Sequence, residues 1–140
     1  MKCAKQYLRQ AYRLNELIEC NKQELYELKE LATNLSGVDY SKDRVQMSHS
    51  GESNYSKIVE KIVELENSIE SDIEKLILLK LEIRTVINQV EDNEEKLLLK
   101  HRYLNFATWG DICEFMHISE RTAHRIHNTA LHNIVIPEKF

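Results

Sequence analysis

Apolar residues recur at helical spacing along residues 1–35 and predict one long amphipathic helix. With Ala4 as the first heptad position, nine of the ten residues in the two seam rows are apolar, which is a strong coiled-coil-like signal. Leu8, Leu17 and Leu31 widen the stripe, so we expect this helix to pack against more than one neighbour. The two rows are Ala4, Ala11, Ile18, Leu25 and Ala32, and Tyr7, Leu14, Asn21, Leu28 and Leu35.

A second apolar stripe runs along residues 56–91 and predicts a second long helix. Residues 36–55, between the two stripes, hold two of the three glycines and five serines but no helical pattern, so we expect a flexible linker. Because the stripes must be buried, the helices are expected to form an antiparallel hairpin within one chain or a coiled coil between chains. Residues 1–91 are therefore interpreted as a long-helix oligomerisation region.

Residues 92–140 predict three shorter helices, and the last two are joined by a tight turn. Asp92 or Asn93 is the expected cap of the first of these helices. Thr108 is the expected N-cap of the second, and Ser119 the expected N-cap of the third. The helical pattern breaks between them, at 116–118. The sequence thus predicts an all-α protein with a helix-turn-helix domain at its C-terminal end.

In DNA-binding helix-turn-helix units, the second helix lies in the major groove and its N-terminal side chains contact base edges. Arg121 and Arg125 lie four residues apart and share one helix face, which suits one base contact and one phosphate contact. The plainer alternative is a solvated pair on an ordinary surface helix. The residues predicted to contact DNA are Thr108, Ser119, Glu120, Arg121, Thr122, His124 and Arg125, together with Lys100 and Arg102 on the preceding helix.

Several of these residues have structural alternatives. Thr108 can reach a phosphate from a helix N-terminus, and capping alone explains it equally well. Glu120 can accept from a cytosine amino group, but its effect on the helix dipole is the better explanation. Trp109 is interpreted as a wedge between the two helices of the turn unit. His127 is expected on the surface.

Charge limits the affinity that one copy can supply. The chain has a formal net charge of −4, and from Glu94 to Phe140 six lysines and arginines balance six acidic residues. Because phosphate contacts supply much of DNA affinity, a single module is expected to bind weakly. We therefore predict a homodimer that binds double-stranded DNA, with RNA polymerase as a candidate further partner.

The remaining motifs exclude most other functions. The sequence lacks a glycine-rich phosphate loop, a GxSxG elbow and an HExxH motif, so we expect neither an enzyme nor a small-molecule substrate or cofactor. Cys113 with His117, and His124 with His127, lack the paired spacing of zinc ligands, so no metal site is predicted. Three scattered cysteines and the lack of a long apolar run indicate a cytoplasmic protein without a membrane segment.

The segment from Glu94 to Ile134 resembles region 4 of sigma-70-type factors. At the position where that family usually has glycine before the second helix, this chain has His117. The whole-chain plan is similar to that of small phage and prophage transcription regulators of the ArpU and RinA type, which act on late-gene expression. This resemblance implies promoter DNA binding alongside host RNA polymerase. The residues that carry it are Arg102-Tyr103, Trp109, Ile112, Met116-His117-Ile118-Ser119, Arg121-Thr122, Ile126 and Ala130-Leu131.

The alternative is a non-enzymatic helical scaffold or a protein-docking module that binds polymerase without touching DNA. Only the DNA-binding hypothesis requires Arg121 and Arg125. A docking module is instead expected to depend on exposed apolar residues such as Ile134 and Ile136.

Overall fold

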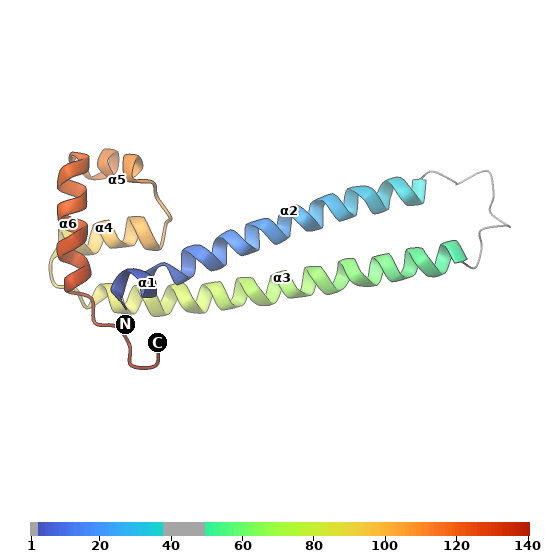
Figure 1. Ribbon diagram of the computed structural model, residues 1–140, viewed down its shortest axis with the longest axis horizontal. Helices are drawn as coiled ribbons and strands as arrows, with labels where there is room; N and C mark the ends of the chain where they lie inside the picture. Colours follow the sequence, from blue (N-terminus) through green and yellow to red (C-terminus); the bar gives the residue numbers. More distant parts are fainter. Residues whose placement is uncertain (1–2, 38–49) are drawn as a thin grey trace. The chain divides into compact units, whose positions relative to one another are not determined.

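The structure, a computed structural model, describes residues 3–37 and 50–140, and all regular structure within these residues is α-helical. This confirms the all-α prediction for the described part of the chain. Six helices follow one another (Figure 1): α1 (Ala4–Leu8), α2 (Gln10–Gly37), α3 (Ser50–Asn88), α4 (Asn93–Tyr103), α5 (Trp109–Met116) and α6 (Glu120–His132).

The boundaries of the long helices differ from the prediction. The first helix is interrupted at Arg9, although the backbone N–H of Arg13 donates to the Arg9 carbonyl at 3.1 Å and the helix continues. α2 extends to Gly37, and α3 begins at Ser50 instead of residue 56. The expected linker, 36–55, is therefore helical at both of its ends, and residues 38–49 lie outside the described residues.

Contacts divide the chain into two compact units. Unit 1 contains residues 1–15 and 75–140, and unit 2 contains Glu16–Glu74. Both ends of the predicted long-helix region, 1–15 and 75–91, thus belong to the same unit as the C-terminal helices. The domain boundary expected at residue 91 therefore falls inside unit 1.

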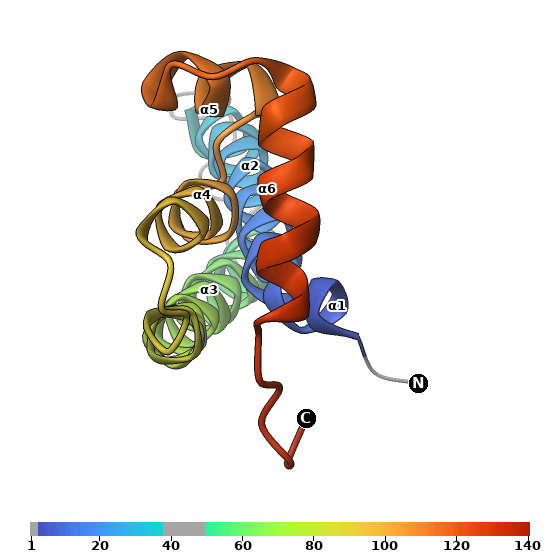
Figure 2. The ribbon, with the colours of Figure 1, turned by 90° about the vertical axis from the view of Figure 1, so that its left-hand side faces the viewer.

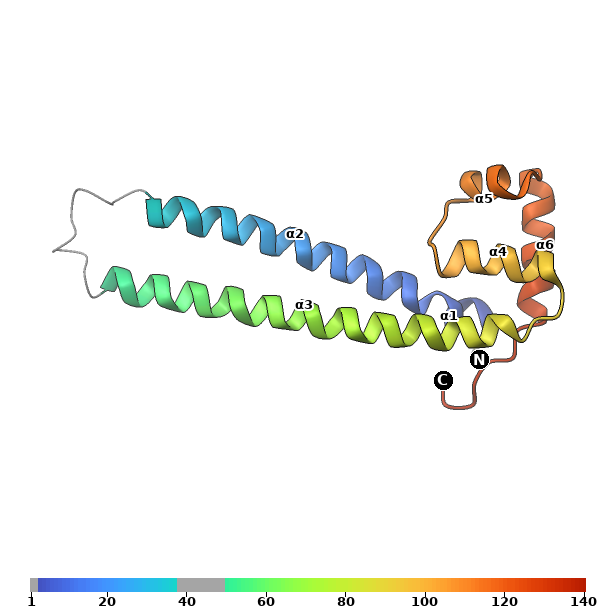
Figure 3. The ribbon, with the colours of Figure 1, turned by 180° about the vertical axis from the view of Figure 1, so that it is seen from behind.

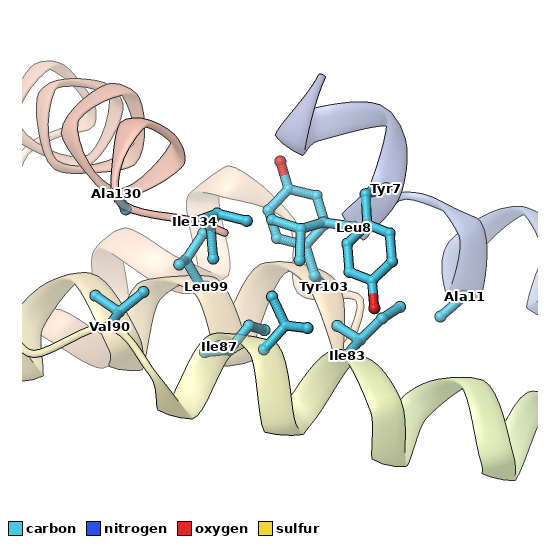
Figure 4. Packing of buried hydrophobic residues seen from close by; sticks show 11 residues of the cluster. Tyr7, Leu8, Ala11, Ile83, Ile87, Val90, Leu99, Tyr103, Ala130 and Ile134 are labelled. Atoms are coloured by element: carbon cyan, nitrogen blue, oxygen red, sulfur yellow. The ribbon is translucent and has the colours of Figure 1, made fainter. Parts of the chain in front are cut away.

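The larger core of unit 1 joins segments that are far apart in the sequence (Figure 4). Tyr7 and Leu8 of α1 are almost fully buried against the end of α3 and against α4. The remaining buried members come from the start of α2, from α3, α4 and α6, and from the residues that follow α3 and α6: Ala11, Ile83, Val86, Ile87, Val90, Leu99, Tyr103, Ala130 and Ile134.

A second, smaller core holds α4, α5 and α6 together. Its buried members are Leu98, Ala107, Ile112 and Ala123. Figure 2 shows α5 at the N-terminal end of α6 and α1 near its C-terminal end, in agreement with the contacts of α6 with α1, α4 and α5. α6 is therefore fixed along its length and not only at the turn.

Two residues predicted to be exposed are packed into unit 1. Ile134 is buried in the larger core, and Ile136 is partly buried against it. The prediction of an exposed apolar surface at these positions was wrong, because the side chains that follow α6 pack against the larger core. Within residues 93–140, the large apolar side chains that are exposed are Leu97, Phe115 and Val135.

In unit 2, α2 and α3 run side by side in opposite directions (Figures 1 and 3). Lys29 Nζ of α2 lies 3.5 Å from Glu66 Oε2 of α3. Among the described residues of this unit, Ile18, Ala32, Ile62 and Ile69 are buried. One row of α2 stays open, since Leu17, Leu28, Leu31 and Leu35 are all exposed. No helix in the described ranges has both the length and the hydropathy that crossing a bilayer requires.

Candidate nucleic-acid interface

α5 and α6 each begin with a side-chain cap, as predicted. Thr108 Oγ1 accepts a hydrogen bond from the backbone N–H of Asp111 at 3.1 Å. Ser119 Oγ accepts from the backbone N–H of Thr122 at 3.1 Å, and its hydroxyl donates to Thr122 Oγ1 at 2.9 Å. Caps of this kind satisfy backbone donors that a helix leaves unpaired. Both cap predictions are confirmed, and Ser119 and Thr122 lie together at the start of α6.

The turn between the two helices depends on His117. This residue has φ 55° and ψ 47°, which is left-handed backbone, and it is the C-cap of α5. The next residue, Ile118, donates its backbone N–H to the Cys113 carbonyl at 3.1 Å. Histidine adopts left-handed backbone more readily than most side chains, although less readily than glycine. The turn therefore forms even though the position lacks glycine.

The first turns of α6 present charged side chains to solvent. Glu120, Arg121, His124 and Arg125 are all exposed. His124 Nε2 lies 3.7 Å from Glu120 Oε1, one helical turn earlier. Among the described residues, the guanidinium groups of Arg121 and Arg125 have no hydrogen-bond or ion-pair partner. Their guanidinium groups are thus available on one face, one helical turn apart.

The two basic residues predicted on α4 differ in their surroundings. The guanidinium of Arg102 donates to the Ala107 carbonyl at 3.0 Å and lies over the Trp109 ring, with Cζ 4.8 Å from the ring centroid. It therefore holds the loop between α4 and α5, and only its remaining donors can contact a ligand. Lys100 is half-buried on the same helix.

Trp109 links this loop to α6. Its ring centroid lies 4.3 Å from that of His124 and 4.9 Å from that of His127. The indole also packs against the smaller core. Trp109 thus lies between α5 and α6, where it orients the helix that carries Arg121 and Arg125.

His127 is buried, not on the surface as the sequence suggested. Only 4% of this residue is exposed. Its Nε2 lies 2.7 Å from Tyr103 Oη, and either group can donate the hydrogen bond. The prediction was wrong because burial of His127 depends on Tyr103, which comes from a different helix.

Burial sets the protonation of this pair. Burial, together with the nearby positive charges of Lys5 and Arg102, lowers the pKa of His127 to about 4. Burial also raises the pKa of Tyr103 to about 12, against the opposing effect of Arg102 and Arg9. At neutral pH both groups are uncharged, so this hydrogen-bonded pair contains no buried charge.

Charge is distributed unevenly between the units. Residues 1–15 and 75–140 hold thirteen lysines and arginines and nine acidic residues, whereas residues 16–74 hold six and fourteen. The formal net charge is therefore +4 for unit 1 and −8 for unit 2, which gives the chain its −4. Residues 94–140 alone have no net charge. Unit 1 is positive because Lys5, Arg9 and Arg13, from the other end of the chain, also belong to it.

Residues 34–134 match the model of a family described as "Protein of unknown function (DUF1492)". The chain belongs to this family. No curated protein and no solved structure matches it. The DUF1492 match includes α4, α5 and α6 with all of the predicted contact residues, but it does not include Lys5 or Arg9 of this protein.

Within the described part of this DUF1492 protein, no group of three or more histidine, cysteine, aspartate or glutamate side chains is placed to hold a metal ion. The structure brings the predicted residues of α6 together at one exposed helix start. The sequence assigned no role to Lys5 or Arg9, because heptad spacing alone does not indicate which other helix these residues face.

Proposed function

We propose that this DUF1492 protein is a sequence-specific DNA-binding transcription regulator that uses α5 and α6 as a helix-turn-helix. The observation that carries the proposal is the capped start of α6, which follows a left-handed turn and exposes Arg121 and Arg125 without protein partners. In this arrangement α6 enters the major groove, one arginine contacts a base edge, and the other contacts a phosphate. The resemblance to region 4 of sigma-70-type factors agrees with this assignment.

The charge of unit 1 also supports DNA binding. A unit with a formal net charge of +4 is attracted to a phosphate backbone, while the acidic unit 2 is repelled from it. Thr108, at the N-terminus of α5, and Ser119 and Thr122, at that of α6, are placed where helix ends contact phosphates. Their hydroxyls already serve as caps, so their contribution to DNA affinity is expected to be smaller than that of the two arginines.

We further propose that the protein acts as a homodimer through unit 2, with the hairpin formed within each chain. The open leucine row of α2, Leu17, Leu28, Leu31 and Leu35, is an apolar face that a second copy would cover. Two linked modules would bind a two-part site more tightly than one module of modest charge. RNA polymerase remains a candidate partner at the promoter.

The test is selection from a random double-stranded DNA pool at several salt concentrations. Wild-type protein is compared with Arg121→Ala/Arg125→Ala and with a control, Arg13→Ala/Arg84→Ala, that removes the same charge from exposed positions outside α6. We expect wild type and control to enrich the same motif, with affinity that falls as salt rises. The α6 double variant is expected to lose the motif and to bind about 10- to 100-fold more weakly.

The rival function is a docking module that binds polymerase without contacting DNA. It would use the exposed apolar side chains of residues 93–140, Leu97, Phe115 and Val135, because Ile134 and Ile136 are packed inward. If no DNA is enriched by any of the three proteins, with or without polymerase, the DNA-binding proposal is rejected. Loss of polymerase binding in Phe115→Ser, with full binding by the α6 double variant, would then support docking.

A further inference from the structure

A pocket of about 190 Å³ opens on unit 1, on the side of α4 that faces α1. Helices α1, α2, α4, α5 and α6 and the loop after α4 all contribute to its lining. None of the functions considered above uses this pocket. Its lining residues divide into three cations and a group of aromatic rings.

The charged lining residues of the pocket are all positive: Lys5, Arg9 and Arg102. Lys5 and Arg9 are exposed, so their charged ends are accessible. Arg102 uses one N–H to hold the Ala107 carbonyl, which fixes the direction of its remaining donors. No carboxylate lines the pocket, so these charges are not neutralised within it.

These cations act electrostatically on the hydrogen-bonded pair Tyr103 and His127, which also lines the pocket. After burial, Lys5 and Arg102 are the largest causes that lower the pKa of His127. Arg102 and Arg9 likewise act on Tyr103 and oppose the rise of its pKa. His127 is therefore neutral at physiological pH, and the positive charge of the pocket comes from its three permanent cations.

The rest of the pocket wall is aromatic. Tyr12 is 38% exposed, and its ring lies edge-on to Phe106 at 5.7 Å between centroids. Phe106 has φ 56°, a left-handed conformation that is unusual for a bulky side chain. The ammonium group of Lys80 lies over the Phe106 ring, with Nζ 4.7 Å from the ring centroid. It places a further positive charge next to this aromatic wall. The loop after α4 thus holds Phe106 against the exposed Tyr12, beside the cations, at a cost in backbone strain.

We propose that this pocket binds a phosphate monoester carried on a planar ring, as in a nucleoside monophosphate, with the phosphate between Lys5, Arg9 and Arg102 and the ring against Tyr12. A phosphate dianion matches three uncompensated cations, and arginine donors suit its oxygens. A volume of about 190 Å³ is below that of pockets for drug-sized ligands, roughly 300 Å³ or more, so part of the ligand stays in solvent. The ligand is bound and not transformed.

The inference does not depend on DNA binding by α6. The phosphate monoester could belong to a free nucleotide or to the 5′ end of a nucleic-acid strand, because both present the same group. Trp109 is the chain's single tryptophan and lines the pocket, so its fluorescence reports occupancy directly.

The experiment titrates the full chain with AMP, adenosine and inorganic phosphate while Trp109 fluorescence is recorded. Lys5→Gln/Arg9→Gln is compared with Arg13→Gln/Arg84→Gln, which removes the same charge outside the pocket. We expect AMP to bind saturably, adenosine and phosphate alone to bind at least about tenfold more weakly, and only the pocket variant to lose about tenfold in affinity. Circular dichroism confirms that both variants fold.

Three results would overturn the proposal. The first is no saturable change with AMP at millimolar concentration, and the second is equal weakening by both double variants. The third is binding of adenosine or of phosphate alone as tightly as AMP. Displacement of AMP by a 5′-phosphorylated oligonucleotide would support the site and assign it to strand ends, whereas AMP binding without such displacement would support it for free nucleotides. Arg121→Ala/Arg125→Ala should keep full AMP affinity. The DNA-binding proposal and the pocket proposal can therefore fail independently of each other.

Discussion

Tyr103 Oη and His127 Nε2 lie 2.7 Å apart inside unit 1, and their rings are stacked with centroids 5.8 Å apart. The two residues belong to α4 and α6, so this contact fixes the recognition-helix candidate to the helix before the turn unit. Because the hydrogen bond is buried, losing one partner would leave a polar atom without compensation.

The neutrality of His127 predicts a loss of stability in mild acid. Its pKa is lowered from 6.5 to about 4 in the folded protein. Between these pH values the unfolded chain binds more protons than the folded chain, so the free energy of unfolding falls as pH decreases from 6.5 to 4. The full effect is about 3 kcal/mol. Urea denaturation of wild type at pH 7 and at pH 4.5 measures it.

The matched variants are His127→Gln, which cannot titrate, and His132→Gln, which removes an exposed histidine from the same helix. The groups facing His127 are Lys5 from α1, Arg102 and Tyr103 from α4, Trp109 from α5 and His124 from its own helix. We expect only His127→Gln to flatten the decline of stability. An equal decline in all three proteins would show that His127 is not the responsible group.

The left-handed backbone of His117 predicts an unusual order of stabilities. His117→Gly and His117→Ala both remove the imidazole, but only glycine adopts φ 55° without steric cost. The glycine variant is expected to be more stable than the alanine variant by about 1 kcal/mol. Thermal unfolding of the two proteins is the measurement. Equal stability of the two variants would mean that position 117 does not hold this backbone conformation in solution.

Glu95 and Asn133 form a side-chain hydrogen bond between α4 and the end of α6. Asn133 Nδ2 donates to Glu95 Oε2 at 2.8 Å, and only 7% of Glu95 is exposed. Asn133→Ala should lower the free energy of unfolding by about 1–3 kcal/mol, because it removes a donor from a buried carboxylate. Asn128→Ala, at an exposed position of α6, is the control. In a Glu95→Leu background, the same Asn133 change should cost much less.

The open leucine row of α2 predicts where dimerisation can be disrupted. Leu31 is 65% exposed in unit 2. Leu31→Glu would place a charge in the proposed interface and should shift the protein from dimer to monomer without changing its helicity. Leu78→Glu, at a leucine of similar exposure in unit 1, should leave the dimer intact. Sedimentation equilibrium distinguishes the two, and a monomeric wild type would refute the proposed dimer.

The sequence predicted features that depend on neighbouring residues. The caps at Thr108 and Ser119 were predictable because a cap needs only one hydroxyl and a backbone N–H three residues later. The helical nature of the chain followed from the spacing of apolar residues in the same way. The break at Arg9 was not predictable, because the apolar spacing continues through it.

Features that depend on distant contacts were not predictable. His127 was interpreted as a surface residue because nothing near it in sequence indicates Tyr103 as its partner. Ile134 was named as an exposed apolar residue, yet it packs in the larger core of unit 1 with residues from distant helices. The cationic pocket needs Lys5, Arg9 and Arg102 together, and helix periodicity alone does not place α1 beside α4.

The core that joins α1 to α6 also sets the order in which the protein can fold during synthesis. Tyr7 and Leu8 leave the ribosome early, whereas Ala130 and Ile134, in the same core, leave it late. α1 has only five residues and cannot be stable by itself. Its apolar face must therefore stay exposed while the intervening chain is translated. The larger core of unit 1 thus cannot close until Ile134 has been synthesised.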